Sequence, residues 1–407
     1  MRLSKLGAVL AGVAILAAAC TGSAASPPAD ELGVVTIPPG EPIHIAYWGV
    51  LSGADASLGQ DSLYGVELAA TDKGKLLDHD IQVTTEDGLC TPEGGATAAQ
   101  KMAADSTLVG LVGSACSDET VGGISTLNDA GLVTISPSNT RPSLTAPDRG
   151  PEYAGYMRTA HSDAFQGKAV AEFVFNELGL TKAATIHDGS AYAEALQQVF
   201  ADEFGTLGGE ILIQEAVSKG QTDMKPVLTR VAAASPEVIY FPIFVAEGGF
   251  IAAQAKEVPG LEDTVLIGSD GMFTSDFVNA AGPAAENMYL SSPNFSAFQA
   301  GYAAFTEKYE AKVGSAPISA FHAHAYDATN ILFAALEKVA VKAADGTLHI
   351  GKQALRDAIY ATKDFQGLTG VLSCSASGDC GAPLIAVYQI TSRETGGEWP
   401  PEAPVWP

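Results

Sequence analysis

The chain has 407 residues, of which 47 are acidic and 22 are basic, and its formal net charge at pH 7 is −25. Proteins that bind nucleic acids contact phosphate through basic residues, so this excess of acid argues against a nucleic-acid partner. Apolar residues make up 47% of the chain and charged residues 17%, which indicates a packed globular protein and not a disordered one. The length corresponds to about two domains.

The first 19 residues have the features of an export signal. Arg2 and Lys5 precede an apolar run from Leu6 to Ala19, which is shorter than the roughly 20 residues of a membrane-spanning helix. The run ends as Leu-Ala-Ala-Ala before Cys20, which resembles the lipobox of bacterial lipoproteins; an ordinary signal peptide with an incidental cysteine is the alternative. We therefore predict a signal peptide over 1–19, lipidation of Cys20, and an extracytoplasmic protein that a lipid alone holds at the membrane of a cell surface or periplasm.

Residues 20–42 are rich in Ala, Ser, Pro and Gly, a composition that is typical of a flexible tether. No later segment of the sequence is long and apolar enough to cross a membrane.

Five cysteines are present. With Cys20 set aside as the lipid site, the other four form an even set, which in an exported chain predicts disulfides. Four cysteines allow three pairings. Cys374 and Cys380 bracket the turn-like Ser-Ala-Ser-Gly-Asp, which can close on itself, and Cys90–Cys116 is then the remaining pair. A zinc site is the alternative, and it is disfavoured because the spacings lack the CxxC form.

From residue 43 onward, strand-like and helix-like segments alternate. The predicted strands are 43–51, 81–85, 108–112, 132–135, 183–187, 210–217, 237–243 and 264–268. Five predicted helices cover 61–71, 167–179, 192–206, 223–234 and 247–257. Two more are predicted to begin at Thr91-Pro92 and at Ser117. Strands separated by helices predict βαβ units with parallel sheets, and two such series predict an α/β protein with two doubly wound lobes. Ligands of such sheets bind where the strands end and the helices begin.

Five segments at these turns resemble the leucine/isoleucine/valine-binding protein family of type I periplasmic binding proteins. They are Gly-Leu-Val-Gly-Ser-Ala-Cys-Ser at 110–117, Ile-Ser-Pro-Ser-Asn-Thr at 135–140, Ile-His-Asp-Gly-Ser-Ala-Tyr-Ala-Glu at 186–194, Ile-Tyr-Phe-Pro-Ile-Phe at 239–244 followed by Glu247, and Ile-Gly-Ser-Asp-Gly at 267–271. Their order and spacing agree over residues 43–392. Cys90 and Cys116 also fall where family members place a disulfide.

The resemblance implies a Venus-flytrap fold, in which two lobes joined by three crossovers close over a ligand. We place the crossovers near Arg158-Thr159, Ser291-Ser292-Pro293 and Leu368–Val371. The expected N-terminal lobe is 43–158 with 293–368, and the expected C-terminal lobe is 159–292 with 369–400.

The resemblance also implies how the first lobe binds an amino acid. The hydroxyl of Ser117 and the amides that follow it would bind the carboxylate at a helix N-terminus; a plain N-cap is the alternative. Ser138 and Thr140 match family positions that offer a backbone carbonyl and a hydroxyl. Asp118 and Glu119 would add negative potential here, which makes a cationic amino acid or a polyamine more plausible as the ligand.

The second lobe would bind the ammonium group. Asp270 stands where the family places an acid for this purpose, although Gly-Ser-Asp-Gly is also a turn signal. Tyr192 would close over the ligand or pack on its own lobe, and Phe244 would form an apolar wall. Leu58 would line the side-chain pocket, and Trp48 would line the mouth of the cleft or pack beneath it.

These features predict a monomeric solute-binding receptor that captures a branched-chain or other amino acid for an ABC importer, without metal or cofactor. A sensory module that reports to a membrane kinase or chemoreceptor is the alternative. We do not expect an enzyme, because the sequence has no Gly-x-Ser-x-Gly elbow and no Walker or dinucleotide-binding loop.

Overall fold

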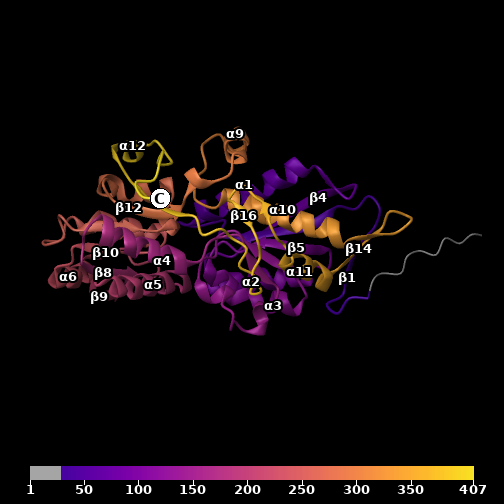
Figure 1. The fold of residues 1–407 in the computed structure, drawn as a ribbon, viewed down its shortest axis with the longest axis horizontal. Coiled ribbons are helices and arrows are strands. Elements are labelled where there is room, and N and C mark those ends of the chain that lie inside the picture. Colours follow the sequence, from indigo (N-terminus) through magenta and orange to yellow (C-terminus); the bar gives the residue numbers. More distant parts are fainter. Residues whose placement is uncertain (1–28) are drawn as a thin grey trace, which may run out of the picture.

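A computed structural model describes residues 29–407 and shows two α/β lobes, each built on a six-stranded sheet (Figure 1). The predicted signal peptide and Cys20 lie outside the described residues. Within residues 29–407, no helix combines the length and the apolar character that crossing a bilayer would require.

The first sheet has the strand order β3-β4-β2-β5-β6-β7. Its strands are β2 (Ile43–Gly49), β3 (Lys75–Leu76), β4 (His79–Asp87), β5 (Leu108–Gly113), β6 (Thr134–Ser136) and β7 (Tyr156–Arg158), all parallel except β3. Its helices are α1 (Ala56–Lys73), α2 (Pro92–Ala104), α3 (Ser117–Asp129), α9 (Gly301–Val313), α10 (His322–Val339) and α11 (Lys352–Tyr360).

Both faces of the first sheet are covered, and β2 shows how. Ile43, Ile45 and Tyr47 pack in a core that α1, α10 and α11 complete, while Ala46 and Trp48 point the other way, into a core with residues of α2 and α3. Side chains of a strand alternate between the faces of a sheet. A strand buried on both faces is therefore apolar throughout, which explains the continuous run that marked this strand in the sequence.

The second sheet has the strand order β17-β12-β11-β10-β8-β9. Its strands are β8 (Lys182–His187), β9 (Glu210–Ala216), β10 (Val238–Tyr240), β11 (Val265–Gly268), β12 (Tyr289–Pro293) and the antiparallel edge strand β17 (Ile385–Gln389). Its helices are α4 (Asp163–Glu172) with a π-helical extension over Phe173–Glu177, α5 (Ala191–Leu207), α6 (Lys225–Ala234), α7 (Val245–Ala255), α8 (Ser275–Ala281) and α12 (Ser392–Thr395). Short 3₁₀ turns cover Pro142–Thr145, Pro151–Tyr153, Asp270–Met272, Gly282–Ala285 and Phe295–Ala297.

Part of the segment expected to be a tether is a strand. β1 (Val34–Ile37) pairs antiparallel with β14 (Leu348–Gly351), which also pairs with β13 (Val341–Lys342). Val35 and Ile37 are buried in the core of the first lobe. Four consecutive β-branched residues favour a strand over a tether, and this local signal outweighs the Pro- and Gly-rich composition around them.

Three connections join the lobes. The first follows β7 and the second follows β12. The third is later than predicted, because Leu372, Cys374 and Cys380 still pack in the core of the first lobe. Leu372 belongs to a small hairpin of β15 (Phe365–Gln366) and β16 (Val371–Leu372). The chain therefore changes lobe between Cys380 and Ile385, not near Leu368–Val371.

Candidate functional site

A small cavity lies between the lobes, where the carboxyl ends of the two sheets face each other. Its lining consists of Leu58, Ala115, Cys116, Ser117, Ser138, Tyr192, Phe244, Asp270, Gly271 and Phe321. The space inside is about 10 Å³, which is about what one water molecule requires. The two lobes are thus nearly in contact across the cavity, and a larger ligand needs the lobes to separate before it can enter.

Six predicted site residues line this cavity, namely Leu58, Ser117, Ser138, Tyr192, Phe244 and Asp270. Two others lie elsewhere. The Thr140 hydroxyl donates a hydrogen bond to Asp163 Oδ2 at 3.0 Å and lies behind the cavity wall. Trp48 is fully buried and packs beneath the sheet, where its Nε1 donates to Thr134 Oγ1 at 3.2 Å. Trp48 lies two residues after Ala46 along β2, so both side chains point to the same face of the sheet, away from the cleft.

The first-lobe wall offers an unsatisfied hydroxyl at a helix N-terminus. Ser117 is the first residue of α3 and is 2% exposed, and its Oγ has no hydrogen-bond partner among the described residues. Residue 116, and not Ser117, occupies the N-cap position, so the Ser117 hydroxyl is not used in capping. Ser138 differs, because its hydroxyl donates to the carbonyl of Ala115 at 2.8 Å. A free hydroxyl beside the first N–H groups of a helix can bind an anion.

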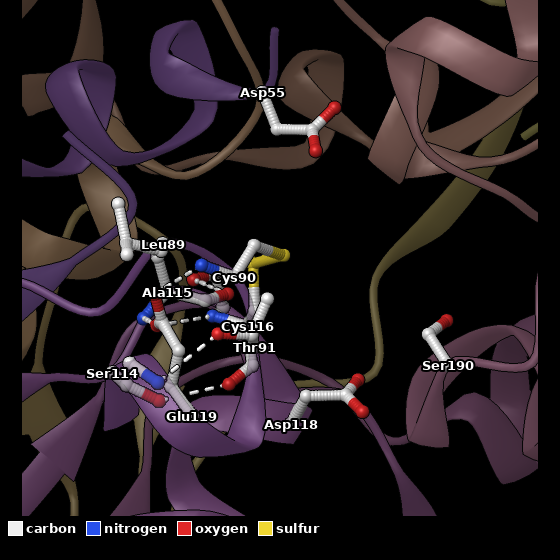
Figure 2. The surroundings of a disulfide bond; sticks show 12 residues. Asp55, Leu89, Cys90, Thr91, Ser114, Ala115, Cys116, Asp118, Glu119 and Ser190 are labelled. Carbon is white, nitrogen blue, oxygen red and sulfur yellow. Dashed lines mark hydrogen bonds between the residues drawn. A yellow bond between two sulfur atoms is a disulfide. The ribbon is translucent and has the colours of Figure 1, made fainter. Parts of the chain in front are cut away.

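Glu119 holds this turn in place, a role that was not predicted from the sequence. Its carboxylate accepts hydrogen bonds from the N–H groups of Cys90 (3.0 Å), Ala115 (3.0 Å) and Cys116 (2.9 Å), as Figure 2 shows. Burial raises the pKa of the Glu119 carboxyl to about 7, although the three N–H donors lower it. Neither Glu119 nor Asp118 lines the cavity, because the Glu119 carboxylate bonds to this turn and the Asp118 carboxylate to the start of α5. The sequence does carry a signal for this role, because Glu119 lies three residues after the N-cap residue Cys116, the spacing of a capping box.

Both predicted disulfides are present, Cys90–Cys116 beside this turn and Cys374–Cys380 farther along the chain. The zinc alternative for these cysteines is therefore wrong.

On the second lobe, Asp270 follows β11 and is 2% exposed. Its Oδ1 accepts from the Gly271 N–H at 2.9 Å and from the Tyr192 hydroxyl, which also lies 2.6 Å from Ser269 Oγ. The ring of Tyr192 packs on that of Phe244, with centroids 5.2 Å apart.

A second acid, Asp163, lies behind Asp270. Burial and then the charge of Asp270 raise the pKa of the Asp163 carboxyl well above its usual range. His161 Nε2 lies 3.4 Å from Asp270 Oδ2. His161 and Asp163 directly follow the first connection between the lobes. The Asp270 side of the cavity is therefore built on the hinge.

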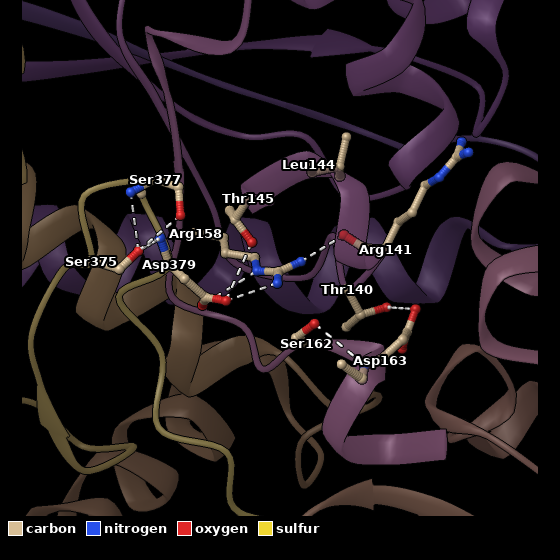
Figure 3. Close-up of polar contacts among 12 residues, drawn as sticks. Thr140, Arg141, Leu144, Thr145, Arg158, Ser162, Asp163, Ser375, Ser377 and Asp379 are labelled. Carbon is tan, nitrogen blue, oxygen red and sulfur yellow. Dashed lines mark hydrogen bonds and ion pairs between the residues drawn. The ribbon is translucent and has the colours of Figure 1, made fainter. Parts of the chain in front are cut away.

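The loop that carries Ser138 is fixed from beneath by a buried arginine (Figure 3). Arg158 Nη1 donates to the carbonyls of Asn139 (3.1 Å) and Arg141 (2.9 Å), and its Nη2 lies 2.9 Å from Asp379 Oδ2. Asp379 belongs to the loop that the Cys374–Cys380 disulfide closes. The disulfide thus closes the loop whose Asp379 carboxylate pairs with Arg158 beneath the cavity wall.

Two lobes of this topology, with a cavity between the carboxyl ends of their sheets, define the two-lobed class of periplasmic binding proteins. The profile of the family described as periplasmic binding protein matches residues 42–394. The chain belongs to this family, as its sequence motifs predicted.

Individual relatives are more distant. The chain is 28% identical over 237 residues to an amino acid binding protein of Pseudomonas aeruginosa, and the match covers 58% of this chain and 62% of that protein. It therefore spans less than two thirds of that relative's length. The Leu/Ile/Val-binding protein of Escherichia coli K12 is 27% identical over 256 residues, covering 62% of this chain and 68% of the relative.

Solved structures share the fold over more of the chain. A leucine binding protein, LivK, of Thermotoga maritima has a TM-score of 0.76 at 22% identity and covers 86% of this chain and 95% of its own. The substrate binding protein LivJ of the branched-chain amino acid transporter of Streptococcus pneumoniae, in complex with isoleucine, has a TM-score of 0.77 at 26% identity, with coverage of 90% and 100%.

Proposed function

We propose that the protein is an extracytoplasmic receptor that captures a free amino acid with an apolar side chain, a branched-chain one first, and delivers it to an ABC importer. The observation that carries this proposal is the pairing of opposite chemistries across one cavity. The unsatisfied Ser117 hydroxyl at a helix N-terminus suits a carboxylate, and the buried Asp270 suits an ammonium group.

The rest of the lining supports an apolar ligand side chain. Leu58, Phe244 and Phe321 supply apolar walls, and Phe321 was not predicted from the sequence. Asp270 is the one acid among the lining residues, so a single ammonium group is matched and the second charge of a lysine or polyamine is not. The relatives are named as an amino acid binding protein and a Leu/Ile/Val-binding protein, which supports the same ligand class. Anchoring through a lipid on Cys20 and action as a monomer remain part of this proposal.

A thermal-shift screen with isothermal titration tests the proposal, using the protein without residues 1–20. A ligand that binds only the folded state raises the melting temperature with RT ln(1 + [L]/Kd). We expect L-leucine, L-isoleucine and L-valine to raise it, and L-lysine and spermidine to leave it unchanged.

Asp270→Asn should weaken L-leucine binding about a hundredfold, because it removes the charge that pairs with the ammonium group. Asp263→Asn, an exposed acid at the other end of β11, is the matched control and should bind as the wild type does. A response to lysine or spermidine alone, or equal affinities for the two variants, would contradict the proposal.

A further inference from the structure

Two acids of the first lobe reach across the cleft to helix N-termini of the second. The Asp118 carboxylate accepts a hydrogen bond from the N–H of Ala191, the first residue of α5, with its two oxygens at 3.0 and 3.2 Å. Asp55 Oδ1 accepts from the N–H of Val245, the first residue of α7, at 3.2 Å. Figure 2 shows Asp118 pointing from α3 towards Ser190, and Asp55 on the other side of the Cys90–Cys116 disulfide.

A third contact runs in the opposite direction. Lys219, in the loop after β9 of the second lobe, donates from Nζ to the carbonyl of Cys90 in the first lobe at 3.0 Å. Because the N–H groups at a helix start have no partner within the helix and carry the positive end of its dipole, a carboxylate is a favourable partner for them. All three contacts join one lobe to the other, so all three are lost when the lobes separate.

None of these three side chains belongs to the cavity lining. Asp55 and Asp118 are nevertheless buried, with exposed fractions of 6% and 9%, because the opposite lobe covers them. Their contacts therefore depend on lobe closure and not on what the cavity holds.

We propose that Asp55, Asp118 and Lys219 form a latch that keeps the lobes closed and so sets the rate at which a ligand leaves the cavity. The proposal rests on the proposed function in one respect, which is that the cavity is where the ligand binds.

The charges around the latch make Lys219 its most sensitive member. Asp188 and Glu247 of the second lobe face Asp55, Asp188 also faces Asp118, and Lys219 faces both latch acids. Arg141 of the first lobe is the other cation, and it acts on Asp118. Four carboxylates thus converge on two cations when the lobes close, so loss of Lys219 removes a contact and leaves the acids repelling one another.

The dissociation rate of L-leucine, measured by stopped-flow displacement, tests the latch. Truncation of a buried, hydrogen-bonded charge acts mainly on dissociation, so we expect Asp118→Ala to raise the rate about tenfold, and Lys219→Met to raise it more. Asp118→Asn keeps an acceptor oxygen and should lie between wild type and Asp118→Ala. The association rate should change by less than about twofold in each variant. Asp129→Ala, an exposed acid at the other end of α3, is the matched control.

Equal dissociation rates in Asp118→Ala, Lys219→Met and the Asp129→Ala control would overturn the latch. Failure of the wild type to bind L-leucine would overturn the proposed ligand instead, and the latch is then tested without ligand. In small-angle scattering, the double variant Asp55→Ala/Asp118→Ala should have a larger radius of gyration than the wild type and Asp129→Ala. An unchanged radius would show that these contacts do not hold the lobes together.

Discussion

The two walls of the cavity are built in opposite ways. On the first lobe, Glu119 and Arg158 use their hydrogen bonds to fix the backbone, and the Ser117 hydroxyl is left without a partner. On the second lobe, Asp270 is already bonded to Gly271 and Tyr192. An arriving ligand therefore adds contacts to a prepared turn on one side, and on the other side it must share or replace an existing contact. Ligand affinity should therefore depend on the rigidity of the first wall and on the charge of the second.

The largest effect should follow the loss of the carboxylate that fixes the first wall. Glu119→Ala leaves three buried N–H groups without an acceptor, and we expect it to lower the free energy of unfolding by about 4 kcal/mol. Urea denaturation measures this loss. Glu93→Ala, an exposed acid near the start of α2, is the control and should cost far less. Equal costs for the two variants would show that the turn does not depend on Glu119.

The same carboxyl makes stability depend on pH. Since its pKa in the folded protein is about 7 and its ordinary value is 4.5, the folded state binds this proton more tightly than the unfolded state does. The resulting stabilisation is fully present below about pH 4.5 and is lost as the pH rises through 7. The wild type should therefore lose stability relative to Glu119→Gln as the pH rises from 5 to 8.

A smaller loss should follow when the support beneath the first wall is cut. Asp379→Ala removes the carboxylate partner of the buried Arg158 guanidinium, and we expect it to cost about 2 kcal/mol of unfolding free energy. Because Arg158 also holds the loop that carries Ser138, ligand affinity should fall as well. Asp364→Ala, an exposed acid in the same region of the chain, is the control. An unchanged affinity in a destabilised Asp379→Ala variant would show that ligand binding does not depend on the Arg158–Asp379 pair.

Removing the free hydroxyl should affect binding but not folding. Ser117→Ala deletes a group that has no partner among residues 29–407, so its unfolding free energy should equal or exceed that of the wild type. The affinity for L-leucine should fall about tenfold, because a hydrogen bond to a charged carboxylate is lost. Calorimetry measures the affinity and urea denaturation the stability. A loss of stability with unchanged affinity would reverse this assignment.

Acidification should tighten binding several-fold through the latch. Burial, with Glu247 and Asp188 nearby, raises the pKa of the Asp55 carboxyl from 3.8 to about 6 in the closed lobes, although Lys219 and the Val245 N–H oppose the rise. The closed state then holds more protons than the open state, so a lower pH favours closing. We expect the affinity to rise about fourfold between pH 8 and pH 5.5. Asp55→Asn should flatten this dependence, leaving the smaller effect of Asp118 in the same direction, and an unaltered profile would contradict the assignment.

The smallest effect should come from the second acid behind the second wall. Since burial and the charge of Asp270 raise the pKa of the Asp163 carboxyl well above its usual range, Asp163→Asn should change the affinity for L-leucine by less than about twofold, in contrast to Asp270→Asn. Titration calorimetry of the two variants compares them directly. A loss in Asp163→Asn as large as that in Asp270→Asn would show that the second wall uses two charged acids and not one.

Much of this molecule was readable along the chain. The N-cap and proline at Thr91-Pro92 mark the start of α2, where the Thr91 side chain accepts from the Gly94 N–H at 3.0 Å. Apolar runs mark the buried strands, and the turns after them carry Ser117 and Asp270. These signals are local, because caps, turns and strand burial depend on a few consecutive residues.

Contacts between distant residues could not be read in this way. Lys219 reaches the carbonyl of Cys90, and Asp55 reaches the start of α7, only because two lobes fold and then meet. Thr140 faces Asp163 and not the cavity for the same reason. Caps, strand burial and the turns were therefore settled by neighbouring residues in the sequence. The partner of each buried charge depended on which segments the folded lobes bring together, since a carboxylate leaves water only where a donor from elsewhere in the chain replaces it.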